Sequence, residues 1–132
     1  MSPKLCLVVD DESSVRTFIR AILEDEQFQT YEAENGVEAL RLVEGLSDGL
    51  DLIVCDIQMP GGDGLTFVSA VRESLPALPI ILMSGTSTPE RQAYPSTAFE
   101  FIQKPFLPET LLAAIESATR KMSFRRMPIR GE

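Results

Sequence analysis

The sequence contains no histidine among its 132 residues, and this absence removes several kinds of chemistry at once. Ser-His-Asp and Cys-His catalysis both need an imidazole group, and so do the common histidine sites for zinc. A phosphohistidine on this chain is excluded for the same reason. The chemistry of this protein therefore has to depend on other side chains.

Long apolar runs and a disulfide framework are also missing. No apolar run approaches the length of a membrane-spanning helix, and Met1 leads through Ser-Pro-Lys straight into a strand-like run rather than a secretion signal. We therefore expect a cytoplasmic protein with no membrane association. Cys6 and Cys55 lie in two strand-like runs with a stagger that puts their sulfur atoms roughly 10 Å apart, too far for a disulfide. Both are expected to be reduced core residues.

Basic residues are scarce in most of the chain. Residues 1–119 carry 7 basic and 19 acidic side chains, a net charge of −12, whereas residues 120–132 carry 5 basic and 1 acidic, a net charge of +4. An acidic body argues against direct binding of nucleic acid, because a phosphate backbone attracts basic surfaces. The basic end is expected to be a disordered tail, a linker stub or an arm for an acidic partner.

The chain does have a regular alternation of strand-like and helix-like segments, enough for one domain. Five such units without a repeat or a long loop predict a parallel sheet with helices on both faces. The strands are expected at 5–9, 28–33, 52–55, 80–83 and 99–102, and the helices at about 15–23, 35–46, 63–75 and from 108 onward.

The third and fourth strands are the most apolar, so they should occupy central positions in the sheet. This favours a doubly wound, flavodoxin-like α/β fold with five parallel strands in the order 2-1-3-4-5. The segment 86–98 contains Pro89 and Pro95, which would interrupt a helix. The fourth helix is therefore expected to be degenerate, with at most a turn or two near 90–93.

Polar residues stand at the carboxyl ends of four of these strands. They are Asp10 and Asp11 after the first strand, Asp56 at the end of the third, Ser84 at the end of the fourth and Lys104 after the fifth. Each residue alone has an ordinary explanation in a turn or at a helix N-terminus. The expected strand order brings them all to one rim, where open α/β sheets bind their ligands.

The charges of this group indicate what it can hold. Two carboxylates about 5 Å apart repel by roughly 3 kcal/mol at an effective dielectric constant near 20. Three carboxylates and one ammonium leave a net charge of −2, which a divalent cation with oxygen ligands cancels. Mg²⁺ fits, because it binds through a few carboxylates and keeps positions for water and phosphate. Such a site suits phosphoryl transfer, with a carboxylate as the nucleophile and an aspartyl phosphate as the product.

The chain resembles the receiver domain of bacterial two-component response regulators over about residues 4–122. The resemblance lies in four groups of residues that occur together at the family's intervals: Asp10-Asp11, Asp56 with Met59-Pro60 and Gly64, Ser84-Gly85, and Lys104-Pro105-Phe106. We therefore interpret residues 1–122 as a receiver domain, either a single-domain regulator or a hybrid-kinase type, and residues 123–132 as the basic tail.

The resemblance implies that Asp56 accepts a phosphoryl group from a phosphohistidine of a sensor histidine kinase or a histidine phosphotransfer protein. Mg²⁺ would be bound by Asp11, by Asp56 and by the backbone carbonyl of Gln58, while Asp10 holds a metal-bound water. The domain would then act as a signalling switch on a downstream protein that the sequence does not identify. It would assist its own phosphorylation and dephosphorylation, but it would not be an enzyme for an outside metabolite.

The resemblance also assigns roles to the residues around Asp56. Lys104 would pair with Asp56 at rest and with the phosphoryl oxygens afterwards, and Ser84 would move its hydroxyl onto the phosphoryl group. Phe101 lies where the family keeps a switching aromatic, although plain core packing explains it equally well. The Lys104–Pro105 bond is expected to be cis, as is usual in the family.

Three other functions remain to be weighed. An aspartyl-phosphate phosphatase of the haloacid dehalogenase type needs a second aspartate two residues after the nucleophile, where this chain has Gln58. A flavodoxin-like flavin binder needs a first loop that cradles phosphate, which Asp10-Asp11-Glu12 would repel. An interaction module that keeps the receiver fold without being phosphorylated stays open, although the intact acidic group argues against it.

Overall fold

The computed structural model describes residues 4–46, 48–59, 64–85 and 100–126, which contain five strands and four helices. The elements in chain order are β1 (Lys4–Val9), α1 (Ser13–Asp25), β2 (Phe28–Ala33), α2 (Gly36–Leu46), β3 (Leu50–Asp56), α3 (Gly64–Ser74), β4 (Ile80–Ser84), β5 (Glu100–Gln103) and α4 (Pro108–Arg126).

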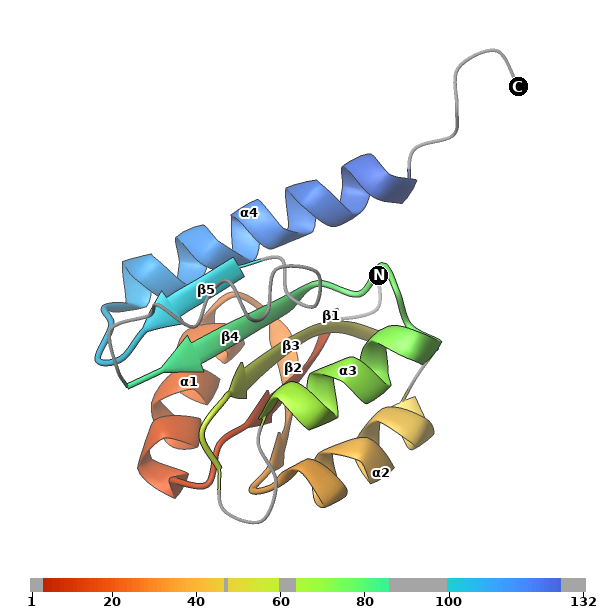
Figure 1. Cartoon of the computed structure of the whole chain (residues 1–132). Helices are drawn as coiled ribbons and strands as arrows, with labels where there is room; N and C mark the ends of the chain where they lie inside the picture. Colours follow the sequence, from red (N-terminus) through yellow and green to blue (C-terminus); the bar gives the residue numbers. More distant parts are fainter. Residues whose placement is uncertain (1–3, 47, 60–63, 86–99, 127–132) are drawn as a thin grey trace.

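The strands form one parallel sheet in the order β2-β1-β3-β4-β5, which confirms the order predicted from the apolar character of the strands. Figure 1 shows α1 and α4 on one face of the sheet and α2 and α3 on the other. Because all the strands are parallel, their carboxyl ends lie at one edge, toward which the arrowheads in Figure 1 point. The fold therefore brings the predicted group of polar residues to a common edge.

Alternate residues of each central strand face opposite sides, and each side has its own apolar cluster. In β1, Leu7 and Val9 belong to the cluster beneath α2 and α3, whereas Cys6 and Val8 belong to the one beneath α1 and α4. The β3 and β4 residues divide in the same way. A strand buried on both faces must be apolar throughout, which explains the unbroken apolar runs of the sequence.

The two cysteines lie on opposite faces of the sheet. Cys6 is in the α1/α4 cluster and Cys55 in the α2/α3 cluster, and both are free thiols with no exposed area. Since Cys6 pairs in register with Leu52, the stagger of three residues is the predicted one. Burial raises the pKa of both thiols, and both are reduced core residues, as predicted.

The third strand begins at Leu50 rather than at the predicted residue 52, because a polar side chain is accommodated in it. The register between β1 and β3 shifts after Leu5, which leaves Asp51 without a partner in the ladder. The backbone N–H of Leu5 donates to Asp51 Oδ2 at 2.9 Å instead. The carboxylate thus takes the place of a backbone acceptor, and the strand continues past a residue that sequence patterns assign to a turn.

Some predictions concern residues outside the described ranges. These residues are the segment 86–98, where a degenerate helix is expected, Asp63, Phe99 and 127–132. The helix α4 continues to Arg126, beyond the domain boundary placed at residue 122. Among the described residues, no helix is long and apolar enough to cross a membrane.

Candidate functional site

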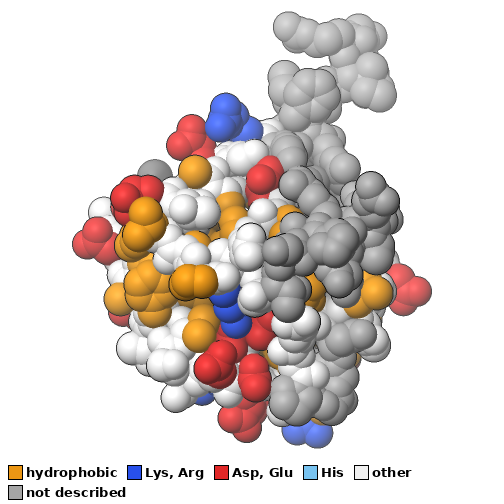
Figure 2. All heavy atoms as spheres, turned by 60° about the vertical axis from the view of Figure 1, so that its left-hand side comes forward, with side chains coloured by type: hydrophobic (Ala, Val, Ile, Leu, Met, Phe, Trp, Pro, Cys, Tyr) orange, Lys and Arg blue, Asp and Glu red, His pale blue; other side chains and the backbone are white. Residues whose placement is uncertain are grey.

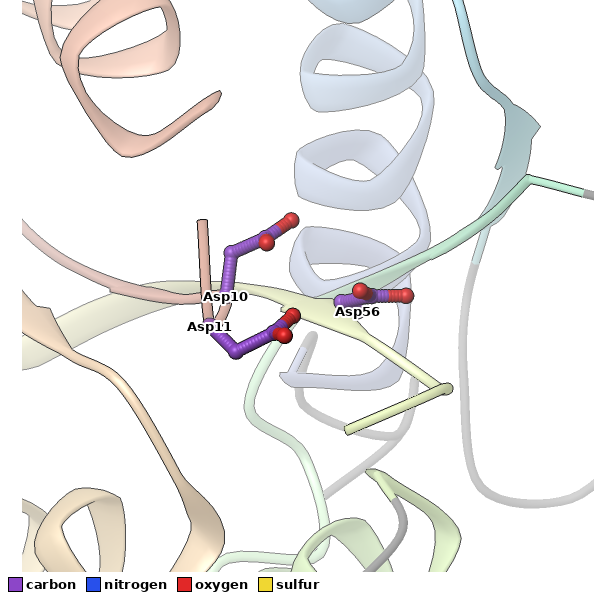
Figure 3. A group of neighbouring side chains, drawn as sticks. All are labelled: Asp10, Asp11 and Asp56. Carbon is purple, nitrogen blue, oxygen red and sulfur yellow. The ribbon is translucent and has the colours of Figure 1, made fainter. Parts of the chain in front are cut away.

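Three carboxylates meet at the carboxyl ends of β1 and β3. Val9 pairs in register with Cys55, so the next residues, Asp10 and Asp56, come level with each other. Figure 3 shows the side chains of Asp10 and Asp11 extending from the end of β1 toward Asp56. One oxygen from each of the three carboxylates lies within 4.8 Å of the others. Asp10 has no exposed area and Asp56 is 4% exposed, whereas Asp11 is open to solvent.

Lys104 supplies the positive charge of this group. Its Nζ lies 2.7 Å from Asp10 Oδ2 and 3.1 Å from Asp56 Oδ2, so it bridges both buried carboxylates. The Asp56 pair was predicted, but the shorter bond to Asp10 was not, because sequence spacing does not reveal which of two adjacent acids faces the lysine. The backbone N–H of Lys104 donates to the carbonyl of Ser84 at 2.7 Å, and the Lys104–Pro105 bond is cis, as predicted.

Backbone N–H groups bind the remaining oxygens of the two buried carboxylates. Gln58 N–H donates to Asp56 Oδ1 at 3.1 Å, and Glu12 N–H donates to Asp10 Oδ1 at 2.9 Å. Each buried carboxylate therefore has one oxygen on the backbone and the other on Lys104. No buried side-chain nitrogen or oxygen among the described residues lacks a hydrogen-bond partner. The group is therefore a satisfied polar network within an apolar fold.

The environment shifts the proton affinities of these groups. Burial raises the pKa of Asp56 above its ordinary value, and the neighbouring charge of Asp10 adds to this, against the opposing effects of the Gln58 hydrogen bond and Lys104. Burial disfavours the charged form of Lys104, but the hydrogen bond to Asp10 and the charge of Asp56 outweigh it and raise the lysine pKa. The lysine is therefore firmly cationic, while burial makes the anionic form of Asp56 less favourable than it is in water.

The two predicted switch residues share one face of the sheet. Ser84 ends β4 and is buried, and its register partner is Gln103 on β5. Phe101 pairs with Leu82 and is partly buried against the cluster beneath α2 and α3. Ser84 therefore lies at the same edge as Asp56, one strand away. Phe101 lies on β5 beside Leu82, two residues further from this edge. This packing is compatible both with a switching aromatic and with a core residue.

The structure explains why residue 64 is a glycine, which the sequence alone did not. A Cβ atom at this position would collide with the backbone carbonyl oxygen of Asp56 and lie 2.7 Å from the Cα of Ile57. The N–H of Gly64 also donates to the carbonyl of Ile57 at 3.0 Å. The start of α3 therefore packs directly on the backbone that carries Asp56, and only glycine permits this approach.

These residues fit a Mg²⁺ ion. The donor set consists of oxygen atoms alone, one of the three carboxylates is exposed, and a single lysine leaves two negative charges without compensation. Zinc or copper would call for sulfur or imidazole ligands, and the chain has no histidine and only buried thiols that face the core. An oxygen-binding divalent cation is therefore the appropriate partner.

Comparison with known proteins places the chain in a family. The profile of the response regulator receiver domain matches residues 6–116. The chain belongs to the response regulator receiver domain family. This receiver domain is 37% identical over 119 residues to the transcriptional regulatory protein ResD of Bacillus subtilis, an alignment that covers 89% of this chain and 48% of ResD.

Solved structures agree with this assignment. A response regulator receiver domain protein from Clostridium thermocellum has a TM-score of 0.84 and 25% identity, covering 92% of this chain and 98% of that one. The beryllofluoride-activated receiver domain of NtrC4 has a TM-score of 0.81 and 33% identity, covering 89% of this chain and 98% of that one. The chain is thus a CheY-like receiver domain of two-component signalling.

This receiver domain spans about half the length of ResD, so activities of the whole ResD protein do not transfer to it directly. The receiver domains of this family are signalling domains. Sequence reasoning missed one contact beside the three carboxylates, the hydrogen bond of 2.7 Å from Arg16 Nη1 to the carbonyl of Asp10. Nothing in the spacing of α1 marks Arg16, because it lies beside the apolar stripe of that helix.

Proposed function

We propose that this receiver domain accepts a phosphoryl group on Asp56 in a Mg²⁺-dependent reaction. The supporting observation is the constellation around Asp56: a nearly buried carboxylate, two further carboxylates with oxygens within 4.8 Å, and a lysine bound to both buried acids. The phosphodonor is a phosphohistidine on a sensor histidine kinase or a histidine phosphotransfer protein. A carboxylate oxygen of Asp56 forms a bond to phosphorus while the phosphorus–nitrogen bond of the donor breaks, and the donor imidazole leaves with the electron pair.

Asp11, Asp56 and the backbone carbonyl of Gln58 would bind Mg²⁺, and Asp10 would hold one of its waters. When bound, the ion neutralises the charge on the phosphoryl oxygens and on the nucleophile. The chain's own groups do the positioning. Gln58 N–H holds Asp56 Oδ1, which fixes the rotation of the carboxylate. Lys104 is cationic and lies at the other carboxylate oxygen, so its ammonium group can bind the phosphoryl oxygens once they arrive.

The conformational change passes through β4 and β5 in this proposal. Ser84 is buried at the end of β4, and its carbonyl accepts the backbone N–H of Lys104. A shift of the Ser84 hydroxyl toward a phosphoryl group would therefore be coupled to the lysine backbone. Phe101, which is only partly buried, would turn further inward. The surface changed in this way would control a downstream protein.

The phosphodonor would dock on an apolar patch beside the site. A groove lined by Ser14, Val15, Phe18, Lys104, Pro105 and Phe106 lies on this face, and Figure 2 shows hydrophobic side chains gathered there near acidic ones. Phe18 and Leu107 are 41% and 65% exposed. Because Lys104 lines this groove and also binds Asp56, a helix bearing a phosphohistidine would reach the nucleophile from here.

A phosphohistidine donor of this kind implies the cytoplasm as the location. Residues 1–122 would form the receiver domain and residues 123–132 a basic tail. The domain would assist its own phosphorylation and dephosphorylation without acting on an outside metabolite.

The direct test uses acetyl phosphate or beryllofluoride with Mg²⁺. Wild-type protein should incorporate phosphate from acetyl phosphate and change its NMR spectrum with either reagent, whereas Asp56→Ala should do neither, because the nucleophile is gone. Asp48→Ala is the matched control, since Asp48 is an exposed aspartate in the turn before β3. Equal phosphate incorporation in wild type and Asp56→Ala would contradict the proposal. The absence of any change in wild type would favour the phosphorylation-independent interaction module.

A further inference from the structure

All the polar groups of Asp10 are engaged in hydrogen bonds. Its N–H donates to the carbonyl of Ala33 at 3.1 Å, and its two carboxylate oxygens accept from Glu12 and Lys104. Its carbonyl oxygen accepts from Arg16 Nη1 at 2.7 Å. This carbonyl belongs to the peptide group that joins Asp10 to Asp11. Its direction therefore decides where the chain places Asp11, whose carboxylate completes the acidic group.

The guanidinium of Arg16 also binds a second partner, the carboxylate of Glu32. Its Nε donates to Glu32 Oε1 on β2 at 2.9 Å, and the Arg16 side chain is only 15% exposed. One planar guanidinium thus connects the edge strand β2 with the peptide group between the two acids. A lysine has a single ammonium on a flexible stem, so it cannot reproduce two bonds in fixed directions.

We propose that Arg16 is a positioning residue for the metal-binding loop, and that Glu32 holds Arg16 in place. Arg16 fixes the peptide between Asp10 and Asp11 and thereby the distance of the Asp11 carboxylate from Asp56. This inference rests on the proposed Mg²⁺-dependent function of the same site. Contacts that orient a metal ligand without touching the metal typically change metal affinity by about 10- to 100-fold when they are lost.

The same helix provides a matched control. Arg20 lies one turn after Arg16 and also binds Glu32, through Nη1 to Oε2 at 3.1 Å. Its Nε binds Glu24 at 2.8 Å, its side chain is 51% exposed, and none of its hydrogen bonds within the described residues reaches Asp10. A change at Arg20 therefore alters the charge near β2 without releasing the carbonyl of Asp10.

The experiment is a calorimetric titration of Mg²⁺ into Arg16→Lys, Arg16→Gln and Arg20→Gln. Coulomb's law alone makes the removal of a positive charge strengthen cation binding, so both glutamine variants should then bind Mg²⁺ slightly more tightly. Positioning makes the opposite prediction for Arg16. We expect the dissociation constant to rise about 10-fold in Arg16→Gln and Arg16→Lys and to stay near the wild-type value in Arg20→Gln.

Two further measurements separate positioning from a general loss of structure. Urea unfolding of each variant without Mg²⁺ measures the fold, and Arg16→Lys, which keeps the charge, serves if Arg16→Gln fails to fold. The rate of phosphorylation by acetyl phosphate, measured against Mg²⁺ concentration, should show a raised half-saturating concentration in the Arg16 variants. Saturating Mg²⁺ should recover most of the rate, because Asp56 itself is intact.

The outcomes distinguish this inference from the proposed function. An unchanged or smaller dissociation constant in both folded Arg16 variants would overturn the role of Arg16 alone. A wild-type protein that binds no Mg²⁺ would overturn the proposed function and this inference together. A 10-fold weakening in the Arg16 variants, with Arg20→Gln at the wild-type value, would establish the positioning role.

Discussion

The interior of the sheet and its carboxyl edge are built from the same strands but obey different rules. Within β1, β3 and β4, buried apolar residues fill both faces of the sheet. At their ends the same strands place Asp10, Asp56 and Ser84, which are the three buried polar or charged residues among those described. In β1 and β3, a buried apolar residue is followed directly by a buried carboxylate: Val9 by Asp10 and Cys55 by Asp56.

The difference shows how a stable sheet can hold buried carboxylates at its edge, where burial alone would destabilise them. Burial of apolar area stabilises the interior without any particular geometry, whereas two buried carboxylates are tolerated only because one lysine and two backbone N–H groups bind them. Buried charges are therefore confined to the edge, where specific partners bind them, while the interior is apolar. Mutations in the two regions should separate stability from metal binding.

The largest loss of stability is expected in the interior. Leu82→Ala removes a fully buried side chain from the central strand β4, and the lost contacts and the cavity should lower the free energy of unfolding by about 3 kcal/mol. Urea unfolding without Mg²⁺ measures this. The Mg²⁺ dissociation constant of the folded variant should stay at the wild-type value.

Val37→Ala is the control for this variant, because Val37 is a 63% exposed residue on α2. It should change the free energy of unfolding by less than about 0.5 kcal/mol. A weaker Mg²⁺ affinity in Leu82→Ala would show that the interior and the edge are not separable.

The second effect concerns the cation at the edge. Lys104→Met leaves the carboxylates of Asp10 and Asp56 buried without their shared positive charge. Because the Lys104 side chain is 16% exposed, we expect a loss of about 2 kcal/mol at pH 7 without Mg²⁺, less than the roughly 3–5 kcal/mol typical of a fully buried pair. The raised pKa of Lys104 means that its contribution is fully present below the unfolded pKa of about 10.4 and is lost as the pH rises through the folded value. Urea unfolding at pH 7 gives the magnitude.

Mg²⁺ should restore part of this loss, so the rise in melting temperature on adding Mg²⁺ should be larger in Lys104→Met than in wild type. The same rise in both proteins would mean that the lysine and the metal do not compensate the same charges.

The smallest effect has the opposite sign. Because burial raises the pKa of Asp56, the folded state holds the proton more tightly than the unfolded state. Stability from this group therefore falls as the pH rises from the unfolded pKa of about 3.9 through the folded value. Asp56→Asn removes this penalty and should be more stable than wild type at pH 7 without Mg²⁺, by a smaller margin than the loss in Lys104→Met.

The difference between the two proteins should disappear near pH 3, where Asp56 is protonated in both states. Urea unfolding of both proteins across this pH range tests the sign. An Asp56→Asn variant that is less stable than wild type at pH 7 would show that the contact with Lys104 outweighs the cost of burial.

Much of the fold could be predicted from local signals. The apolar stripe of α1 and the alternation of strands and helices sufficed for the elements, and the relative apolarity of β3 and β4 gave their central places. The start of β3 could not be predicted, because Asp51 is polar and is accommodated through the N–H of Leu5, a residue 46 positions away. Local patterns carry no information about such a distant partner.

The candidate site divides in the same way. By itself, the sequence determined which residues stand at the strand ends and therefore which functional groups meet at the edge: three carboxylates, a hydroxyl and an amine. The tertiary structure alone decided how they bind one another, with Lys104 shared between Asp10 and Asp56, Gly64 packed on the Asp56 backbone, and Arg16 on the carbonyl of Asp10. The physical reason is that strand ends follow from local apolar patterns, whereas hydrogen bonds between distant segments depend on distances of a few tenths of an ångström that only the packed chain fixes.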